Sequence, residues 1–111
     1  MNIQKFSIEK KQNEAERKSR ENLAALYRLY SKFGWTDLNQ THAAARVPGN
    51  SNQFFLKPDE LLMEEVTASS LAKVDLQGNQ VDGDCPVNRA GAFIHAAILG
   101  ARPEINYSAH T

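Results

Sequence analysis

Apolar residues recur at helical spacing in two parts of the chain. From about Arg20 they follow one another in steps of three and four residues, which predicts an amphipathic helix ending at Gly34. The same spacing after Asn88, a good N-cap residue, predicts a second helix that Gly100 closes. The two apolar stripes consist of Leu23, Leu26, Tyr27, Tyr30 and Phe33 in the first helix and of Phe93, Ile94, Ala97 and Ile98 in the second.

Strand-like and turn-like segments complete the pattern. Residues 53–56 are rich in strand formers, and residues 73–76 alternate in polarity before Gly78-Asn79 turns the chain back as a hairpin. Residues 104–109 predict a last strand that carries His110 at its far end. The order of these elements predicts one α/β domain, a sheet with helices packed on it. We expect this domain over residues 21–111 and a polar lead-in over residues 1–20.

The charge balance and the cysteine content narrow the possible partners and setting. Thirteen basic and thirteen acidic side chains cancel, so net charge favours neither nucleic acid nor an anionic membrane as a partner. The longest apolar run is too short to cross a bilayer, so we expect no membrane partner. The single cysteine, Cys85, cannot form an internal disulfide, which fits a reducing, cytoplasmic setting.

Several short motifs, in their order and spacing, resemble the class II aldolase/adducin family from about Leu23 to Thr111, and most closely its adducin-like branch. The motifs are Gly34-Trp35, Thr41-His42, Arg46-Val47-Pro48-Gly49, Glu64-Glu65-Val66-Thr67-Ala68-Ser69-Ser70-Leu71, Lys73-Val74-Asp75, Gly78-Asn79, Asn88, Ala90-Gly91, His95-Ala96-Ala97-Ile98 and Ala101-Arg102-Pro103. The resemblance implies a three-layer α/β/α sandwich around a mostly antiparallel central sheet, of which this chain would be a truncated N-terminal part. It also implies a homo-oligomer, because family members often form tetramers.

The resemblance further implies which residues form a site. In active family members, three histidines hold a zinc ion (Zn2+) that polarises the carbonyl group of a small hydroxy-carbonyl substrate, while a glutamate moves the proton. His110 matches one of the zinc ligands, and His42, Asn88 and Arg89 match positions around the substrate pocket. Gly91 stands in the place of the glutamate, so we expect no catalytic residue in this chain.

The sequence leaves two functions open. The chain could be the first part of a metal-dependent lyase that is inactive alone, since one histidine does not bind zinc stably. Alternatively, it could be a non-catalytic, adducin-like interaction domain. Glu60 stands where sugar-phosphate aldolases have a phosphate-loop glycine, which argues against a phosphorylated substrate. His95 is expected to be a packed structural histidine, whereas His42 fits pocket lining and structural hydrogen bonding equally well.

A strand that ends near Thr111 without a further neighbour would expose its edge and apolar surface. We therefore expect marginal folding or self-association of this chain.

Overall fold

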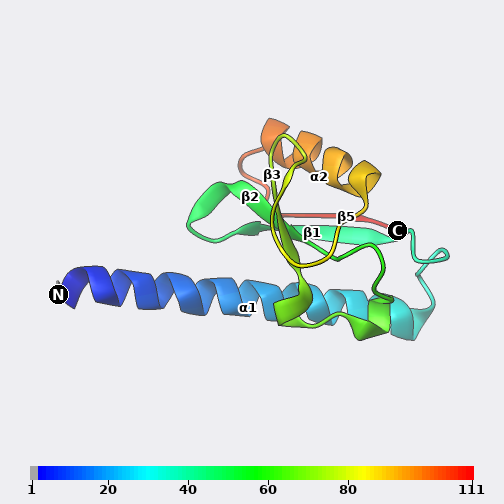
Figure 1. Ribbon diagram of the computed structural model, residues 1–111, viewed down its shortest axis with the longest axis horizontal. Coiled ribbons are helices and arrows are strands. Elements are labelled where there is room, and N and C mark those ends of the chain that lie inside the picture. Colours follow the sequence, from blue (N-terminus) through cyan, green and yellow to red (C-terminus); the bar gives the residue numbers. More distant parts are fainter. Residues whose placement is uncertain (1–2) are drawn as a thin grey trace.

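The computed structural model, which describes residues 3–111, forms a sheet between two helices (Figure 1). The helices are α1 (Ile3–Phe33) and α2 (Arg89–Ala101), and two 3₁₀ turns are η1 (Met63–Glu65) and η2 (Ala68–Ser70). The strands are β1 (His42–Val47), β2 (Asn50–Leu56), β3 (Ala72–Asp75), β4 (Gln80–Asp82) and β5 (Tyr107–His110). The strand order is β4-β3-β2-β1-β5, and every neighbouring pair is antiparallel. Figure 1 shows α1 on one face of the sheet and α2 on the other, which confirms the predicted α/β/α layers.

Helix α1 starts earlier than the apolar pattern predicts. The polar residues before Arg20 are helical as well, because Lys, Glu, Gln, Arg and Ala all favour helix. This part extends beyond the sheet in Figure 1, and the division at residue 20 stays a prediction. No helix among residues 3–111 is long and apolar enough to cross a bilayer. The helix ends as predicted at Gly34, whose φ of 73° is left-handed.

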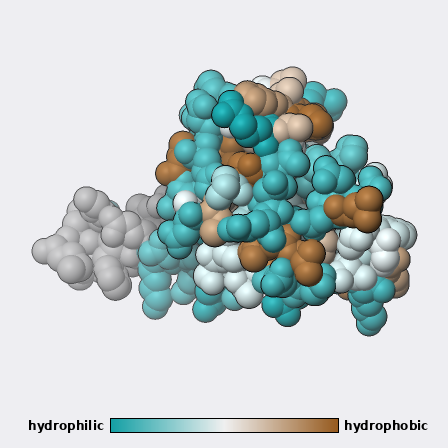
Figure 2. Space-filling view, turned by 45° about the vertical axis from the view of Figure 1, so that its right-hand side comes forward, coloured by the Kyte–Doolittle hydropathy of each residue, from teal (hydrophilic) through white to brown (hydrophobic). Residues whose placement is uncertain are grey.

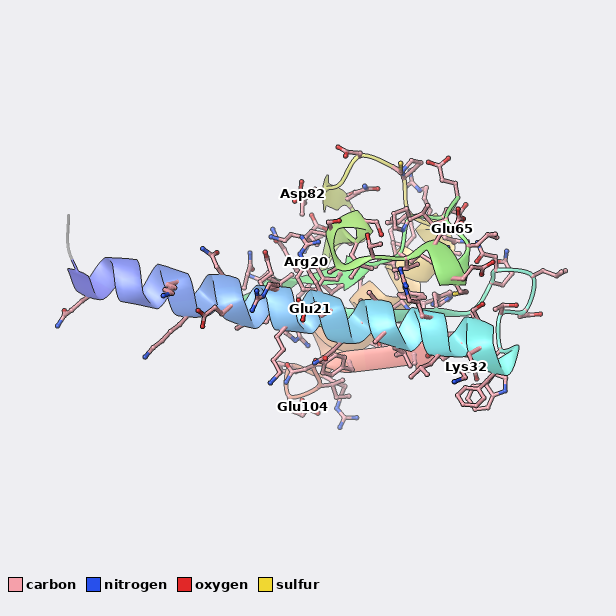
Figure 3. All side chains as sticks on the ribbon, turned by 90° about the horizontal axis from the view of Figure 1, so that it is seen from below. Arg20, Glu21, Lys32, Glu65, Asp82 and Glu104 are labelled. Atoms are coloured by element: carbon pink, nitrogen blue, oxygen red, sulfur yellow. The ribbon has the colours of Figure 1, made fainter. Side chains whose placement is uncertain are left out.

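The predicted apolar stripe of α1 forms one core, except at its end. Leu23, Tyr27 and Tyr30 are buried, whereas Phe33 is 62% exposed. The Tyr27 hydroxyl donates to the Ala43 carbonyl (2.5 Å) and accepts from the Ala43 N–H (2.9 Å), which ties α1 to β1. On the side of η2, Arg20 donates to the carbonyls of residues 68 and 71. Figure 3 shows that the segments carrying Glu65 and Glu104 lie on opposite sides of α1.

Strand β1, which the sequence analysis does not predict, lies inside the sheet between β2 and β5. Alanine is a poor strand former, so the run Ala43-Ala44-Ala45 carries little strand signal. Its alternate residues enter two separate cores: Ala43 and Ala45 pack with the side chains of α1, and Ala44 packs with those of α2. The small side chains allow both helices to pack closely on this strand.

Helix α2 presents a different face to the sheet from the one predicted. Its buried residues are Gly91, Ala92, His95, Ala96 and Leu99. The predicted stripe of Phe93, Ile94 and Ile98 is 48%, 44% and 40% exposed. Figure 2 shows brown, apolar residues at the top of the molecule, where α2 lies. Gly100 does not close the helix, which continues to Ala101 and is capped by Arg102. The small residues face the sheet because they let α2 lie close to β1.

Arg46 in β1 binds the connection between α2 and β5. Its side chain is buried although it is charged, and it faces the end of α2. The guanidinium donates five hydrogen bonds of 2.7–3.3 Å to main-chain carbonyls, those of Ser51, Leu99, Arg102 and Ile105. A positive charge at the C-terminal end of a helix is also favoured by the helix dipole. Arg46 therefore holds the connection between α2 and β5 against β1.

We expect Arg46→Met to lower the free energy of unfolding by about 3 kcal/mol or more, because buried carbonyls would lose a charged donor. Urea denaturation followed by circular dichroism measures this change. Arg17→Met is the control, since the Arg17 side chain is 74% exposed and its ion pair with Glu21 contributes less than about 0.5 kcal/mol. A loss for Arg46→Met as small as that of the control would contradict this role.

Candidate functional site

The three histidines of the chain meet at one end of the sheet. His42 is the first residue of β1, and His110, the last residue of β5, is its direct partner across the two strands. Their rings are stacked, with centroids 4.8 Å apart and planes 14° from parallel. His95 reaches the same place from α2, with its ring centroid 4.7 Å from that of His42. His95 and His110 follow His42 by 53 and 68 positions in the sequence, and the fold brings all three into one cluster.

A chain of hydrogen bonds runs through this histidine cluster. His42 Nδ1 lies 2.6 Å from His95 Nε2, and His95 Nδ1 lies 2.6 Å from Ser108 Oγ. Each short contact needs one donor and one acceptor, so the nitrogen that carries the proton in one ring determines which nitrogen carries it in the next. If Ser108 donates, His42 carries its proton on Nε2; if Ser108 accepts, His42 carries it on Nδ1. The hydrogen-bonding role of Ser108 therefore determines whether Nε2 of His42 is a donor or an acceptor.

Burial favours the neutral forms of His42 and His95 by lowering the pKa of each imidazole. His95 is only 1% exposed, and desolvation, assisted by the nearby His42 and His110, lowers the pKa of His95 from 6.5 to about 4. Desolvation, with smaller contributions from His110 and Lys57, also lowers the pKa of His42. Each neutral imidazole offers one N–H donor and one acceptor nitrogen, which fits the chain of hydrogen bonds.

A small cavity adjoins the cluster, with a volume of about 10 Å³. Its lining includes Thr41, His42, Lys57, Asn88 and Gly91. The ammonium group of Lys57 donates to three main-chain carbonyls, those of residues 58, 59 and 61, at 2.6–3.3 Å. Burial lowers the pKa of Lys57. The cavity thus has room for about one small polar group. The neighbouring Lys57 ammonium group already donates its three N–H bonds to carbonyls.

Two oxygen atoms of residues that line this cavity lack a hydrogen-bond partner among the described residues: Asn39 Oδ1 and Thr41 Oγ1. Asn39 belongs to a run of three left-handed residues, Asp37, Leu38 and Asn39, with φ of 44°, 54° and 70°. Such conformations cost free energy for residues other than glycine, and they concentrate at functional sites. The sequence analysis misses Asn39, Thr41, Lys57 and Ser108 as site residues, because only the fold brings them together.

The structure brings together three of the four site residues that the resemblance implies. His42 and Asn88 line the cavity, and the Asn88 side chain also caps α2 by accepting from the Gly91 N–H at 3.1 Å. His110 lies exposed at the end of β5, stacked on His42. The guanidinium of Arg89 instead lies 5.7 Å from the centre of the Phe93 ring, and Arg89 is not among the residues that line this cavity.

Gly91 packs against the imidazole of His42. A Cβ atom at position 91 would lie 3.4 Å from His42 Cδ2, which is an ordinary contact distance. Any longer side chain there would have to pass beside this ring.

A three-histidine zinc centre does not fit the described residues. Among residues 3–111, no three His, Cys, Asp or Glu side chains are arranged to hold a metal ion. Both ring nitrogens of His95 are engaged, with His42 and with Ser108, and one nitrogen of His42 is engaged as well. This supports the prediction that His95 is a structural histidine. Of the three, His110 has both nitrogens outside the cluster's hydrogen-bond chain.

Because of His95, we expect the free energy of unfolding to fall as the pH drops from about 6.5 to 4. Above that window His95 is neutral in both states; within it the unfolded chain binds a proton that the folded chain does not, since the folded pKa is about 4. The full effect is about 3 kcal/mol. Urea denaturation at pH 7 and pH 4.5 measures it. His95→Gln should remove most of this dependence, and parallel pH profiles of the two proteins would refute the assignment.

Comparison with known proteins agrees with the fold and the motifs. A family model described as the class II aldolase and adducin N-terminal domain matches residues 21–111. The chain is 45% identical over 107 residues to a putative aldolase class 2 protein of Caulobacter vibrioides. The matched region covers 95% of this chain and 41% of that protein. It is 46% identical over 91 residues to alpha-adducin of Rattus norvegicus. This match covers 79% of the chain and 12% of alpha-adducin.

Solved structures show the same likeness. An aldolase II superfamily protein from Pseudomonas syringae has a TM-score of 0.80 and 42% identity over 87% of this chain and 40% of its own. L-fuculose 1-phosphate aldolase from Glaciozyma antarctica PI12 has a TM-score of 0.81 and 31% identity over 86% of this chain and 40% of its own. The chain thus spans less than half the length of these relatives. From the family model and these relatives together, we conclude that the chain belongs to the class II aldolase and adducin family.

Proposed function

We propose that this chain carries the first part of a class II aldolase-type site, with one metal ligand and part of a substrate pocket, and that it has no lyase activity alone. His110 is the proposed zinc ligand, and His42, Asn88 and Arg89 are the proposed pocket residues. The substrate class is a small hydroxy-carbonyl compound. One arrangement supports this function: β5 places His110 against His42, beside the cavity that His42 and Asn88 line.

The incomplete donor set supports inactivity of the chain alone. The proposed zinc ligand is a single imidazole at the exposed end of a strand, because the nitrogens of His95 are engaged elsewhere. When bound in the family, the metal polarises the substrate carbonyl. This chain's own residues would orient the substrate: Asn88 and His42 line the cavity beside the reacting group, and Arg89 at the start of α2 would face the substrate after a change of side-chain rotamer.

The charges around the cavity favour an unphosphorylated substrate. Asp59 lines the cavity, and Glu60 follows it in the chain, so both would repel a phosphate dianion. The Lys57 ammonium group donates its three N–H bonds to main-chain carbonyls, which leaves none of them for a phosphate oxygen. A free hydroxy-carbonyl compound therefore suits this chain better than a sugar phosphate.

For zinc titrated into the 111-residue chain by calorimetry, we expect a Kd weaker than about 10 μM, because one imidazole supplies only part of the free energy of a complete centre. His110→Ala should weaken the binding further, while His95→Gln, the control, should leave it unchanged. Retro-aldol cleavage of small hydroxy-carbonyl compounds should stay at the uncatalysed rate. Stoichiometric sub-micromolar zinc with turnover would refute inactivity, and equal binding by His110→Ala would refute the ligand.

A second candidate function is an adducin-like assembly domain without catalysis. β5 is the outermost strand of the sheet, so its outer edge has no strand partner among residues 3–111. Tyr107 on this strand is 54% exposed, and Trp35 after the end of α1 is 60% exposed. Open strand edges and exposed apolar side chains both favour association with another chain. The occupant proposed here is a second copy, since the zero net charge of the chain does not oppose self-association.

We expect the chain to self-associate at about 100 μM, a concentration at which contacts of even about 5.5 kcal/mol become populated. Sedimentation velocity measures this. Tyr107→Lys should shift the distribution toward the monomer, because a charge on an edge strand opposes strand pairing. Ile98→Lys is the matched control, since Ile98 is 40% exposed on α2, on the other side of the sheet. A monomer at this concentration would contradict assembly through β5.

We also propose that the protein works in the cytoplasm, without nucleic acid or membrane partners. The free thiol of Cys85 supports a reducing setting. The balanced charge supports the absence of an electrostatic partner.

A further inference from the structure

We propose that the basic N-terminal part of α1, residues 3–18, docks on an acidic and apolar surface at the other end of α1 in a second copy of the chain. We call residues 3–18 the basic arm. The acceptor surface consists of four apolar and four acidic residues: Phe33, Trp35, Leu38, Leu62, Asp59, Glu60, Glu64 and Glu65. This contact extends the assembly function proposed above, but it does not involve β5 and is tested separately.

The zero net charge of the chain conceals a strong segregation of charge. Residues 1–20 carry six basic and three acidic side chains, whereas residues 58–84 carry seven acidic side chains and one basic. That basic residue, Lys73, pairs with Glu16 of α1 at 2.6 Å. Within the part of the chain that the structure describes, no carboxylate of residues 58–84 forms a salt bridge. These carboxylates therefore favour a partner of opposite charge.

The acceptor surface is one continuous region around the end of α1. Glu64 Oε2 accepts a hydrogen bond from the hydroxyl of Ser31 on α1, at 3.2 Å. The Asn39 side chain joins the two neighbouring loops, because its Nδ2 donates to the carbonyls of Asp59 and Leu61 at 3.2 and 3.1 Å. The acidic residues thus lie next to the apolar residues that follow α1.

Four large apolar side chains are exposed on this surface. Phe33 and Trp35 are 62% and 60% exposed, and their ring centroids lie 6.0 Å apart. Leu38 is 93% exposed, and Leu62 is 49% exposed. In Figure 2, which brings this end of the molecule forward, apolar patches interrupt the hydrophilic surface. Exposed apolar side chains that gather with charged ones are typical of a protein interface.

Leu38 is unfavourable in two ways in a single chain. Its φ of 54° is left-handed, a conformation that Asp37 and Asn39 on either side tolerate better than a leucine does. Its side chain also buries almost no apolar area, so folding of one chain gains little from it. Burial of Leu38 against a second copy would offset both costs.

Helix α1 keeps the basic arm away from the acceptor surface of its own chain. Figure 1 shows the arm beyond the sheet and the end of α1 on the opposite side of the molecule. Lys10 and Phe33 lie about 35 Å apart along the helix, at about 1.5 Å per residue. The arm residues Lys10, Lys11 and Glu14 are exposed. Because a helical segment is stabilised mainly by tertiary packing, the arm would gain stability from another molecule.

The two surfaces complement each other in charge and in polarity. The sequence of the arm contains Ile3, Phe6 and Ile8 among its lysines. Arg28 and Lys32 lie near the acceptor surface, but its four carboxylates outnumber them. The contact joins different surfaces of two copies, so it is a head-to-tail contact that each further copy can repeat.

Charge reversal tests this contact in chains that carry Tyr107→Lys, in which pairing through β5 is opposed. The arm variant adds Lys10→Glu and Lys11→Glu, and the surface variant adds Glu60→Lys and Glu64→Lys. At low salt each should raise the apparent Kd of self-association about tenfold or more, because each reversal turns an attraction into a repulsion. Sedimentation velocity from about 10 to 300 μM measures this Kd.

Mixing the two variants tests whether the arm and the surface meet each other. An equimolar mixture should associate like the Tyr107→Lys chain, because the lysine arm of one variant meets the glutamate surface of the other. Asp82→Lys with Glu104→Lys is the matched control. It changes the net charge as the surface variant does, but outside the acceptor surface, and should leave the Kd unchanged.

Leu38→Asn tests the apolar part of the contact. The Kd should rise about tenfold, because the contact loses a buried leucine. The melting temperature should stay equal or rise, since asparagine tolerates the left-handed backbone, and this readout confirms that the variant folds. Ile94→Asn is the control, because Ile94 is 44% exposed on α2, and it should leave the Kd unchanged.

Three results would overturn the contact. These are a monomeric Tyr107→Lys chain at about 300 μM and low salt, an unchanged Kd in the arm variant, and a mixture that associates no better than either variant alone. Binding of an unrelated lysine-rich peptide to the surface, with an unchanged Kd in the arm variant, would assign the surface to another protein. If Tyr107→Lys has no effect while charge reversal does, this contact stands and assembly through β5 fails.

Discussion

The contact between the Arg46 guanidinium and the main-chain carbonyls around the end of α2 is the constraint on which the candidate site depends. A buried guanidinium is tolerable only where acceptors surround it, and here Leu99, Arg102 and Ile105 supply most of them. These carbonyls lie at the end of α2 and in the connection that leads to β5. Arg46 holds this connection against β1, and the strand that follows pairs Ser108 with Ala44 and His110 with His42.

The second determinant is the small size of the residues between the layers. Ala43, Ala44 and Ala45 let α1 and α2 approach β1 from opposite faces. On α2 the small side chains and His95 face the sheet, which leaves Phe93, Ile94 and Ile98 exposed. Close packing at the centre therefore produces two features at once: a polar cluster between the layers and an apolar outer surface on α2.

Locally unfavourable features concentrate at one end of the sheet. This end carries three consecutive left-handed residues, two buried oxygens without a partner among the described residues, the buried ammonium group of Lys57, and His95 with its strongly lowered pKa. Each of them opposes folding or limits the pH range of stability, and the two cores around Tyr27 and Phe54 compensate for them.

The sequence alone determined the features that depend on local chemistry. These are the stripe and the glycine end of α1, the Asn88 cap of α2, the hairpin at Gly78-Asn79 and the motifs that resemble the family. Only the tertiary structure decided that an alanine run forms an inner strand, because burial on both faces replaces strand propensity there. It also decided that α2 turns its smaller face inward, since close packing outweighs its hydrophobic periodicity. The cluster of His42, His95 and His110 with Ser108 depends on the antiparallel pairing of β1 with β5, which no local pattern specifies.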